Sequence, residues 1–221
     1  MTCGAPMGEG ETLLEIVHED PHFVVVDKVS GMLSVPGRGP EKTDCVAARV
    51  RRMYPGCIEH PAVHRLDMDT SGLLVVALDA ESHRNLSLQF RERETSKRYV
   101  ALLDGELKGE GGTIELPFRL DVDNRPYQIH DEVHGKLGIT HWERLSVESG
   151  ATRVRFTPVT GRTHQLRVHS AHALGLGIPI VGDPLYGRGT GPAQMKLHAS
   201  DLGFQHPVTG ERLFFHSPAP F

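Results

Sequence analysis

The feature that most constrains the fold of this chain is a charged stretch that runs directly into a run of aliphatic residues. Residues 64–76 read HRLDMDTSGLLVV, and Ala77 continues the apolar run. Surface loops carry charge readily, but they seldom continue into five consecutive residues as apolar as residues 73–77. An apolar run of that length bounded by turn residues is typical of a buried strand. We therefore expect a buried strand over residues 73–78, with the polar residues before it at the edge of the core.

The rest of the chain predicts short strands interspersed with a few helices. Apolar and turn patterns predict strands over residues 13–18, 23–27, 99–103, 142–147 and 153–157, closing strands around residues 206–211, and irregular connections with short strands over residues 105–133. Three- and four-residue apolar spacing predicts a helix over residues 46–53 capped by Thr43 or Asp44, a helix capped by Asp79, and a helix within residues 161–175. Residues 1–12 are expected to be a disordered tail. The pattern favours one α+β domain with a mixed sheet over residues 13–221.

The charge of the chain limits the partners it can have. Its 24 Lys and Arg residues against 28 Asp and Glu give a net charge of -4, which argues against a non-specific binder of polyanions. Basic residues nevertheless cluster in two groups, Arg49, Arg51 and Arg52 in the first, and Arg84, Arg91, Arg93, Lys97 and Arg98 in the second. Acidic residues interrupt the second group, so a solvated helix face and a binding surface both remain open.

The cysteines and the N-terminus indicate where the protein works. Cys3, Cys45 and Cys57 are an odd number without a C-x-x-C pair, which argues against a disulfide framework and against a structural zinc site. The chain shows no signal-peptide pattern at its N-terminus and no apolar run long enough to cross a bilayer. We expect a soluble protein of the reducing cytoplasm.

Asp67 is the first candidate for chemistry, because it lies at the mouth of the expected buried strand. A partly desolvated carboxylate is costly unless a cation compensates its charge. Three cations are available for this, namely Arg65, Arg162 and Arg167. An arginine bound through two hydrogen bonds would also fix the direction of the carboxylate, as a nucleophile or a base requires. A structural Asp–Arg pair inside the core is the alternative.

Fourteen histidines raise the question of a metal site. In a helix within residues 161–175, His164 and His169 would lie about 140° apart, so they do not easily share an ion. His169 and His172 share a face, but no third ligand follows at a metal-site spacing. Asp67 and Asp69 could bind magnesium if both lay on one face of a strand, although Asp69 fits a turn better. A metal-dependent hydrolase therefore stays open as an alternative.

Tyr99 begins an apolar strand directly after Lys97 and Arg98. It is either a strand-end aromatic with its hydroxyl in water or a platform on which a nucleic-acid base stacks while the basic residues hold phosphates. Composition alone does not separate these two interpretations.

Five segments read HRLDMDTSGLLVVA, SKRYVALLDG, GRTHQLRVHSAHALG, PIVGDPLYG and LHASDLGFQHPVTGE. Together they resemble the RluA-type family of pseudouridine synthases, because they occur in the family's order along roughly residues 13–221. The resemblance implies a catalytic domain with a mixed, mainly antiparallel sheet flanked by helices and a central RNA-binding cleft. It also implies an isomerase that acts on uridine in RNA. Such an enzyme breaks the bond between ribose C1′ and base N1 and rejoins the uracil through C5, without cofactor or metal.

The resemblance assigns roles to individual residues. Asp67 matches the catalytic aspartate, which acts as a nucleophile or assists glycosidic cleavage, and Arg167 matches the arginine that pairs with it. Tyr99 matches the tyrosine that stacks on the uracil and helps to remove the C5 proton. Arg65 looks like the residue that fills the gap left by a flipped-out nucleotide. The expected RNA-binding residues are His64, Arg65, Lys97, Arg98 and Arg162.

The expected substrate follows from the same resemblance. The chain looks like the minimal subgroup without an S4-like RNA-binding domain, which implies a 23S ribosomal RNA hairpin, a tRNA anticodon stem-loop, or both as substrate. A monomer is expected, because no repeated apolar face stands out. Residues 28–31 read KVSG where the family often has K-P-S-G, and residues 175–178 read GLGI, which lengthens a connection. A non-catalytic RNA-binding factor, which would tolerate Asp67→Asn, remains the rival interpretation.

Overall fold

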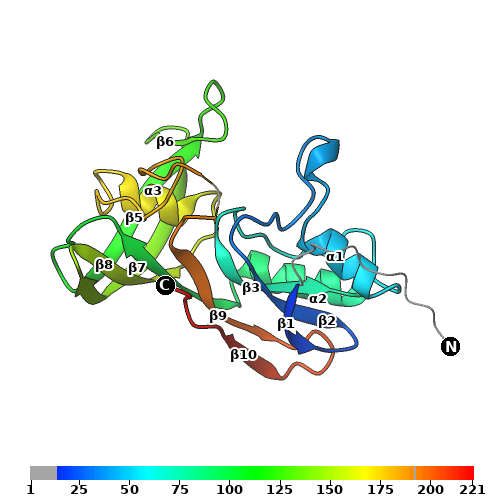
Figure 1. The fold of residues 1–221 in the computed structure, drawn as a ribbon. Coiled ribbons are helices and arrows are strands. Elements are labelled where there is room, and N and C mark those ends of the chain that lie inside the picture. The colour runs from blue at the N-terminus through cyan, green and yellow to red at the C-terminus, as the bar shows by residue number, and fades with distance from the viewer. Residues whose placement is uncertain (1–13, 192) are drawn as a thin grey trace.

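The computed structural model describes residues 14–191 and 193–221 (Figure 1). In chain order the elements are β1 Glu15–Glu19, β2 Phe23–Lys28, the 3-10 helix η1 Pro40–Lys42, α1 Val46–Met53, β3 Ser71–Ala77, α2 Ala80–Glu92, β4 Ser96–Leu103, β5 Gly111–Leu120, β6 Gln128–His130, β7 Lys136–Glu148, β8 Ala151–Pro158, α3 Gln165–Ala171, β9 Leu197–Gln205 and β10 Arg212–His216. The predicted disordered tail and Cys3 lie outside the described residues.

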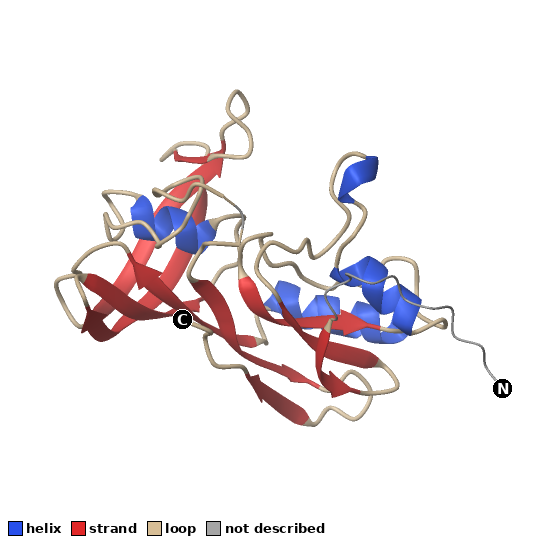
Figure 2. Ribbon diagram, in the orientation of Figure 1, coloured by secondary structure: helices blue, strands red, loops and turns tan. Residues whose placement is uncertain are grey.

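These strands form one sheet in the order β1-β2-β3-β9-β4-β8-β7-β5-β6, with β10 also paired to β9. β3 and β9 pair in parallel, and the other pairs in the described part of the chain are antiparallel. Figure 2 shows the helices beside the sheet, with α1 and α2 near β1, β2 and β3 and with α3 near β5 and β7. The prediction of an α+β fold with a mixed, mainly antiparallel sheet is confirmed.

Every residue of β3 is buried, as the apolar run predicts. Side chains alternate across a strand, and here both sets meet a helix. Leu74 and Val76 belong to the apolar cluster that contains Val46 and Val50 of α1. Leu73, Val75 and Ala77 belong to another cluster, which contains Leu86 of α2. Since β3 lies between β2 and β9, the loop that precedes it starts from a rigid element.

The parallel pairing of β3 with β9 places that loop beside the middle of the sheet. Ser71 and Gly72 pair with His198 and Ala199. A Cβ on Gly72 would lie 2.4 Å from the Ala199 carbonyl oxygen, and the φ of Gly72 is +109°. Only glycine allows this approach without strain. Gly72 therefore allows the Thr-Ser-Gly segment, residues 70–72, to pass directly beside β9.

Helix α1 is capped differently from the prediction. Its N-cap is Cys45, whose Sγ accepts the N–H of Ala48 at 3.4 Å. The prediction that Thr43 or Asp44 caps this helix is wrong, and Asp44 instead pairs with Arg49, with Arg49 Nη2 and Asp44 Oδ2 2.5 Å apart. Asp79 caps α2 as predicted, because its Oδ1 accepts the N–H of Ser82 at 2.8 Å.

The prediction of irregular structure over residues 105–133 is wrong for β5, a strand of ten residues. Pro117 made this segment look irregular, but it costs no hydrogen bond to β7. Its carbonyl accepts the N–H of Asp131, on the side away from β7. In a strand the N and O of one residue point the same way, so the missing N–H also faces away from the β7 ladder.

Helix α3 is shorter than the predicted interval, since it covers Gln165–Ala171. It begins after His164, which has a φ of 57°, and it ends at His172, where the chain becomes extended. Gly175 and Leu176 then donate their N–H groups to the carbonyls of His172 and His169 and fold the chain back. No helix in residues 14–191 and 193–221 has the length and apolar composition needed to span a membrane.

Candidate active site

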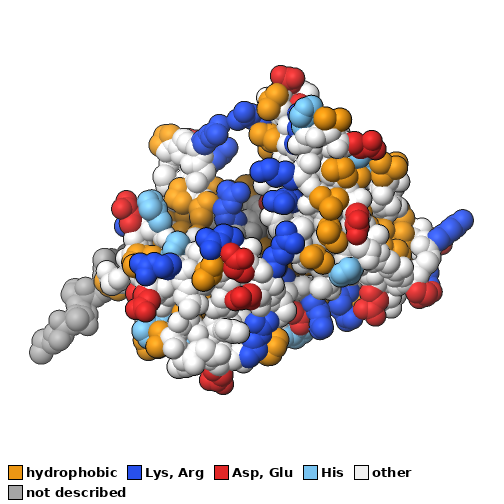
Figure 3. All heavy atoms as spheres, turned by 180° about the vertical axis from the view of Figure 1, so that it is seen from behind, with side chains coloured by type: hydrophobic (Ala, Val, Ile, Leu, Met, Phe, Trp, Pro, Cys, Tyr) orange, Lys and Arg blue, Asp and Glu red, His pale blue; other side chains and the backbone are white. Residues whose placement is uncertain are grey.

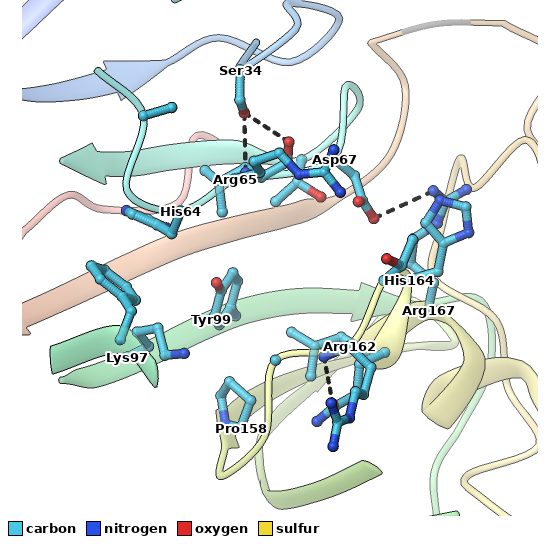
Figure 4. Close-up of a pocket in the computed structure, with 18 of the residues that line it drawn as sticks. Ser34, His64, Arg65, Asp67, Lys97, Tyr99, Pro158, Arg162, His164 and Arg167 are labelled. Carbon is cyan, nitrogen blue, oxygen red and sulfur yellow. Dashed lines mark hydrogen bonds and ion pairs between the residues drawn. The ribbon is translucent and has the colours of Figure 1, made fainter. Parts of the chain in front are cut away.

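A pocket of about 850 Å³ opens where the loop before β3, the strand β4 and the loop between β8 and α3 meet. Figure 3 shows a face of the molecule that is hollowed near its centre, with Lys and Arg side chains around the hollow. The close-up in Figure 4 shows how residues from these three segments face one another. The predicted site residues that line the pocket are Asp67, Tyr99, Arg167, His64, Arg65, Lys97 and Arg162.

The backbone on both sides of Asp67 is held by side chains from the preceding part of the chain. Ser34 Oγ donates to the Leu66 carbonyl at 2.8 Å and accepts the Leu66 N–H at 3.0 Å. Lys28 Nζ donates to the Met68 carbonyl at 2.9 Å. The Asp67 side chain itself keeps an exposed fraction of 30%. A fixed backbone thus presents an accessible carboxylate to the pocket.

The turn at residues 28–31 forms although the chain lacks the proline that the family often has there. Gly31 has a φ of +88° and donates its N–H to the Met68 carbonyl at 2.9 Å. Ser30 Oγ donates to the Asp69 carbonyl at 2.6 Å. Burial lowers the pKa of Lys28 to about 8, against the opposing effect of the Asp67 and Asp69 charges. The turn therefore forms through Gly31.

Arg167 lies beside Asp67, with 3.6 Å between Arg167 Nη1 and Asp67 Oδ2 (dashed line in Figure 4). Its shorter contacts go to Asp183, from Nε to Oδ2 at 2.8 Å and from Nη2 to Oδ1 at 2.6 Å. Burial alone would lower the pKa of Arg167, but the hydrogen bonds and charge of Asp183 and the charge of Asp67 raise it overall. The guanidinium is therefore a permanent cation shared by two carboxylates.

Sequence reasoning assigned no role to Asp183. The available signal was a lone charged residue in the otherwise apolar segment PIVGDPL. Its side chain is fully buried, and burial would raise its pKa, but Arg167 and two backbone N–H groups lower that pKa overall. An unpaired charge at such a position would be strongly destabilising, so Asp183 and Arg167 require each other.

Tyr186, from the same segment as Asp183, is a second residue that sequence reasoning missed. Its ring lies over the guanidinium of Arg167, 5.3 Å from ring centre to Cζ. Its hydroxyl accepts the N–H of Gln128 at 2.8 Å and lies 2.9 Å from His164 Nδ1. One side chain thus connects Arg167, the start of α3 and the strand β6.

Tyr99 and Lys97 face the pocket together, because residues two apart on a strand share a face. Burial raises the pKa of Tyr99, and the Asp67 charge raises it further, so the hydroxyl is neutral. Burial lowers the pKa of Lys97, whose Nζ lies 5.7 Å from the centre of the Phe90 ring. Arg98 does not line the pocket, since it points from the other face of β4.

His64 lines the pocket as an uncharged side chain. Its ring stacks on Phe90 with 4.2 Å between ring centres, and its Nε2 accepts the N–H of Val75 at 3.2 Å. Burial, with a further effect of the Lys97 charge, lowers the pKa of His64 to about 3. The side chain therefore supports β3 at Val75 and offers the pocket no positive charge.

The two basic groups of the sequence separate in space. Arg91, Arg93 and Lys97 of the second group line the pocket, as do Arg65 and Arg162. The first group does not line it. Arg49 is buried against Asp44, while Arg51 and Arg52 line a smaller pocket with Cys57. Part of the second group therefore lies at the pocket, whereas the first group lies away from it.

The residues of the metal hypothesis do not converge. Asp69 is buried, and its Oδ1 accepts the N–H of Ala193 at 3.1 Å, so it does not join Asp67 in the pocket. His169 is fully buried and its ring packs edge-on to Phe118. Within residues 14–191 and 193–221, no three His, Cys, Asp or Glu side chains are grouped to hold a metal ion.

The pocket suits a substrate that carries both negative charge and a flat ring, because cations surround it and an aromatic face lies inside it. Nucleic acid has this chemistry, and the accessible carboxylate inside indicates an enzyme that acts on it. Residues 22–172 match the family described as RNA pseudouridylate synthase. The chain belongs to this family and is an RNA pseudouridine synthase, an isomerase.

Relatives extend the match to nearly the whole chain. The dual-specificity RNA pseudouridine synthase RluA of Pasteurella multocida (strain Pm70) is 46% identical over 216 residues, which cover 94% of each chain. The protein of the same name from Escherichia coli (strain K12) is 44% identical over 216 residues, which cover 96% of this chain and 95% of the relative. These matches confirm the resemblance seen in the sequence.

Solved structures agree with the fold. Human RNA Pseudouridylate Synthase Domain Containing 1 superposes with a TM-score of 0.76 at 31% identity, covering 97% of this chain and 87% of that one. Human RNA Pseudouridylate Synthase Domain Containing 4 gives a TM-score of 0.71 at 23% identity, covering 93% and 88%. The second likeness bears on the fold alone.

Proposed function

We propose that the enzyme converts specific uridines to pseudouridine in a 23S ribosomal RNA hairpin, a tRNA anticodon stem-loop, or both. Two relatives that share nearly the whole chain are named dual-specificity enzymes, which supports more than one target. The observation that carries the reaction is the Asp67 carboxylate, which faces the pocket 3.6 Å from Arg167 and beside the ring of Tyr99.

The isomerisation exchanges one bond to the uracil for another. The bond between C1′ and N1 breaks, the uracil turns, and a bond forms between C1′ and C5. The C5 proton leaves and N1 gains a proton, so the atoms balance. Asp67 acts at the sugar, either by attacking C1′ or by assisting the departure of the base. Both pathways use a charged carboxylate, and the Arg167 guanidinium supplies compensating charge.

The target nucleotide leaves the RNA stack to reach Asp67. C1′ and C5 are not both accessible within a stacked helix, so the base flips into the pocket. It stacks there on Tyr99. A neutral phenol offers a flat ring but is a poor base, and we therefore assign stacking to Tyr99 in preference to removal of the C5 proton. Arg65, exposed at the mouth of the pocket, fills the gap in the RNA.

Cations around the pocket bind the RNA backbone. Arg65, Arg162 and Lys97 line the pocket, which supports contacts with phosphates that flank the flipped nucleotide, and each neutralised phosphate releases counterions. His64 contributes in a different way. Because its Nε2 accepts the Val75 N–H, its remaining donor is an Nδ1–H, which suits a neutral hydrogen bond to a phosphate oxygen.

We also propose that the enzyme works as a monomer in the cytoplasm. The sequence shows no repeated apolar face of the kind that pairs protomers. The free thiols of Cys45 and Cys57 fit a reducing compartment.

The test uses the two hairpins, each carrying uridine tritiated at C5, without added metal. Wild type is expected to release tritium and to leave pseudouridine in the digested RNA, whereas Asp67→Asn is expected to bind RNA and release none. The hairpin that reacts identifies the target. If wild type binds both hairpins and releases tritium from neither them nor total uridine-labelled RNA, the chain is an RNA-binding factor instead.

A further inference from the structure

The catalytic carboxylate shares its arginine with a second carboxylate that no substrate reaches. Asp183 is 0% exposed and does not line the pocket. It nevertheless receives the two tight hydrogen bonds of Arg167, at 2.8 and 2.6 Å, while Asp67 lies 3.6 Å from the remaining Nη1. The stronger partner of the arginine is therefore the residue without access to the reaction.

Asp183 is itself fixed by the backbone around it. Its Oδ1 accepts the N–H groups of Leu185 and Tyr186 at 2.8 and 3.1 Å. Its own carbonyl accepts those of Gly187 and Gly189 at 3.2 and 3.0 Å. A carboxylate held in this way fixes the plane and position of the guanidinium that it binds.

We propose that Asp183 is a positioning residue of the isomerase, which occupies the tight bonds of Arg167 so that Asp67 stays compensated in charge but loosely held. The inference rests on the proposed function of Asp67. A carboxylate in a bidentate arginine pair is strongly stabilised and directed along the pair. At 3.6 Å from one nitrogen, Asp67 keeps the electrostatic support of the cation and remains free to approach C1′.

The loss of the Asp183 charge would change the partner of the arginine. With an asparagine at that position the guanidinium has one remaining carboxylate, Asp67, and would turn toward it. A tighter pair would aim the Asp67 carboxylate at the arginine instead of the sugar. Misplacement of a reacting group by about 1 Å costs on the order of a hundredfold in rate. Asp183 is fully buried and does not line the pocket, so we expect RNA affinity not to change with it.

The chain contains a matched pair that serves as control. Asp131 also binds an arginine, with Arg119 Nε and Asp131 Oδ2 2.5 Å apart. Its Oδ1 accepts the N–H groups of Val133 and His134 at 3.0 and 2.9 Å, as the Oδ1 of Asp183 accepts two backbone N–H groups. Asp131 does not line the pocket. Asp131→Asn therefore imposes the same chemical change on a similar turn away from the reaction.

The experiment measures kcat and KM by tritium release, and the dissociation constant of the hairpin by filter binding, for wild type, Asp183→Asn, Asp183→Glu and Asp131→Asn. For folded Asp183→Asn we expect kcat to fall about a hundredfold while the dissociation constant stays within about twofold. Asp183→Glu, which restores the charge at a shifted position, is expected to recover part of that loss. Asp131→Asn is expected to match wild type.

Several outcomes would overturn the inference. A folded Asp183→Asn with kcat within about threefold of wild type would do so, and so would parallel losses of kcat and RNA affinity. Should Asp183→Asn fail to fold, Asp183→Glu decides, since an unchanged kcat excludes positioning and a lower kcat with unchanged affinity supports it. Absence of release by wild type would instead refute the proposed function, and the inference with it.

Discussion

The floor and the rim of the pocket use charge in opposite ways. We define the floor as Asp67 and Arg167, together with Asp183 buried behind them, and the rim as the cations that line the opening, namely Arg65, Arg91, Arg93, Lys97 and Arg162. Arg167 and Asp183 are 3% and 0% exposed and are joined by two short hydrogen bonds, whereas four of the five rim cations are exposed. Buried pairs fix geometry, and exposed cations attract a polyanion over a distance set by salt.

This difference explains how a chain with a net charge of -4 can act on RNA. Lys and Arg side chains gather around one hollow (Figure 3), while acidic side chains are scattered over the visible face, including just below the hollow. The net charge does not predict the arrangement of the floor, where two carboxylates share one arginine. The comparison predicts that changes in the floor alter stability and chemistry and that changes in the rim alter binding.

The largest effect is expected from Arg167→Gln. This change leaves Asp183 buried without its cation, and breaking a buried pair costs about 3 to 5 kcal/mol of unfolding free energy. It should also abolish tritium release, because Asp67 loses its compensating charge. Arg119→Gln is the control, since Arg119 is 40% exposed and an exposed pair contributes about 1 kcal/mol or less. Equal losses of unfolding free energy for the two variants, measured by urea unfolding, would contradict the distinction between the buried and the exposed ion pair.

Low pH is expected to lower the free energy of unfolding. Burial lowers the pKa of His169 to about 4 and that of His64 to about 3. In the unfolded chain both titrate near 6.5, so below that pH the unfolded state binds more protons than the folded state. The contribution of these two histidines to the free energy of unfolding is therefore fully present above pH 6.5. It is lost as the pH falls toward 4, by an amount on the order of 3 kcal/mol for His169 alone.

Unfolding of wild type and His169→Leu at several pH values checks this expectation. His169 is fully buried and neither ring nitrogen has a hydrogen-bond partner, so leucine keeps the volume and removes the titration. The variant should lose less stability than wild type between pH 6.5 and 4. An identical dependence of unfolding free energy on pH in the two proteins would show that His169 is charged or solvated in the folded state.

A smaller effect is expected at the rim. Arg162→Gln removes one cation from the pocket opening and should weaken hairpin binding about tenfold, lower the slope of log affinity against log salt by about 1, and leave kcat at saturation nearly unchanged. Arg98→Gln is the matched control, because Arg98 lies on the same strand as Lys97 but faces away from the pocket. An equal loss of affinity for both variants would show that RNA also contacts the other face of β4.

Local patterns predicted much of the fold and of the site. The strand β3 followed from an apolar run, and the start of α2 followed from a capping aspartate. The order of five motifs predicted the family and the catalytic candidates. These features depend on neighbours in the sequence, so the sequence alone carries them.

Features that depend on which side chains meet in space were not predictable in this way. Asp183 reaches Arg167 across sixteen residues, and only the folded loop shows that it takes the shorter bonds. The assignment of Arg98 to the RNA surface requires knowing which face of β4 it occupies, and the charge of His64 depends on its burial. Strand β5 was hidden by Pro117, and only the folded structure shows that the nitrogen of Pro117 faces away from the β7 ladder.

The most direct measurement of the division between floor and rim is single-turnover tritium release by Asp67→Asn at an enzyme concentration that saturates the hairpin. Saturation removes any difference in binding, so the rate reports on chemistry alone. We predict no release above background, with the hairpin bound as tightly as by wild type. Release at more than about one hundredth of the wild-type rate would contradict the assignment of the reaction to Asp67.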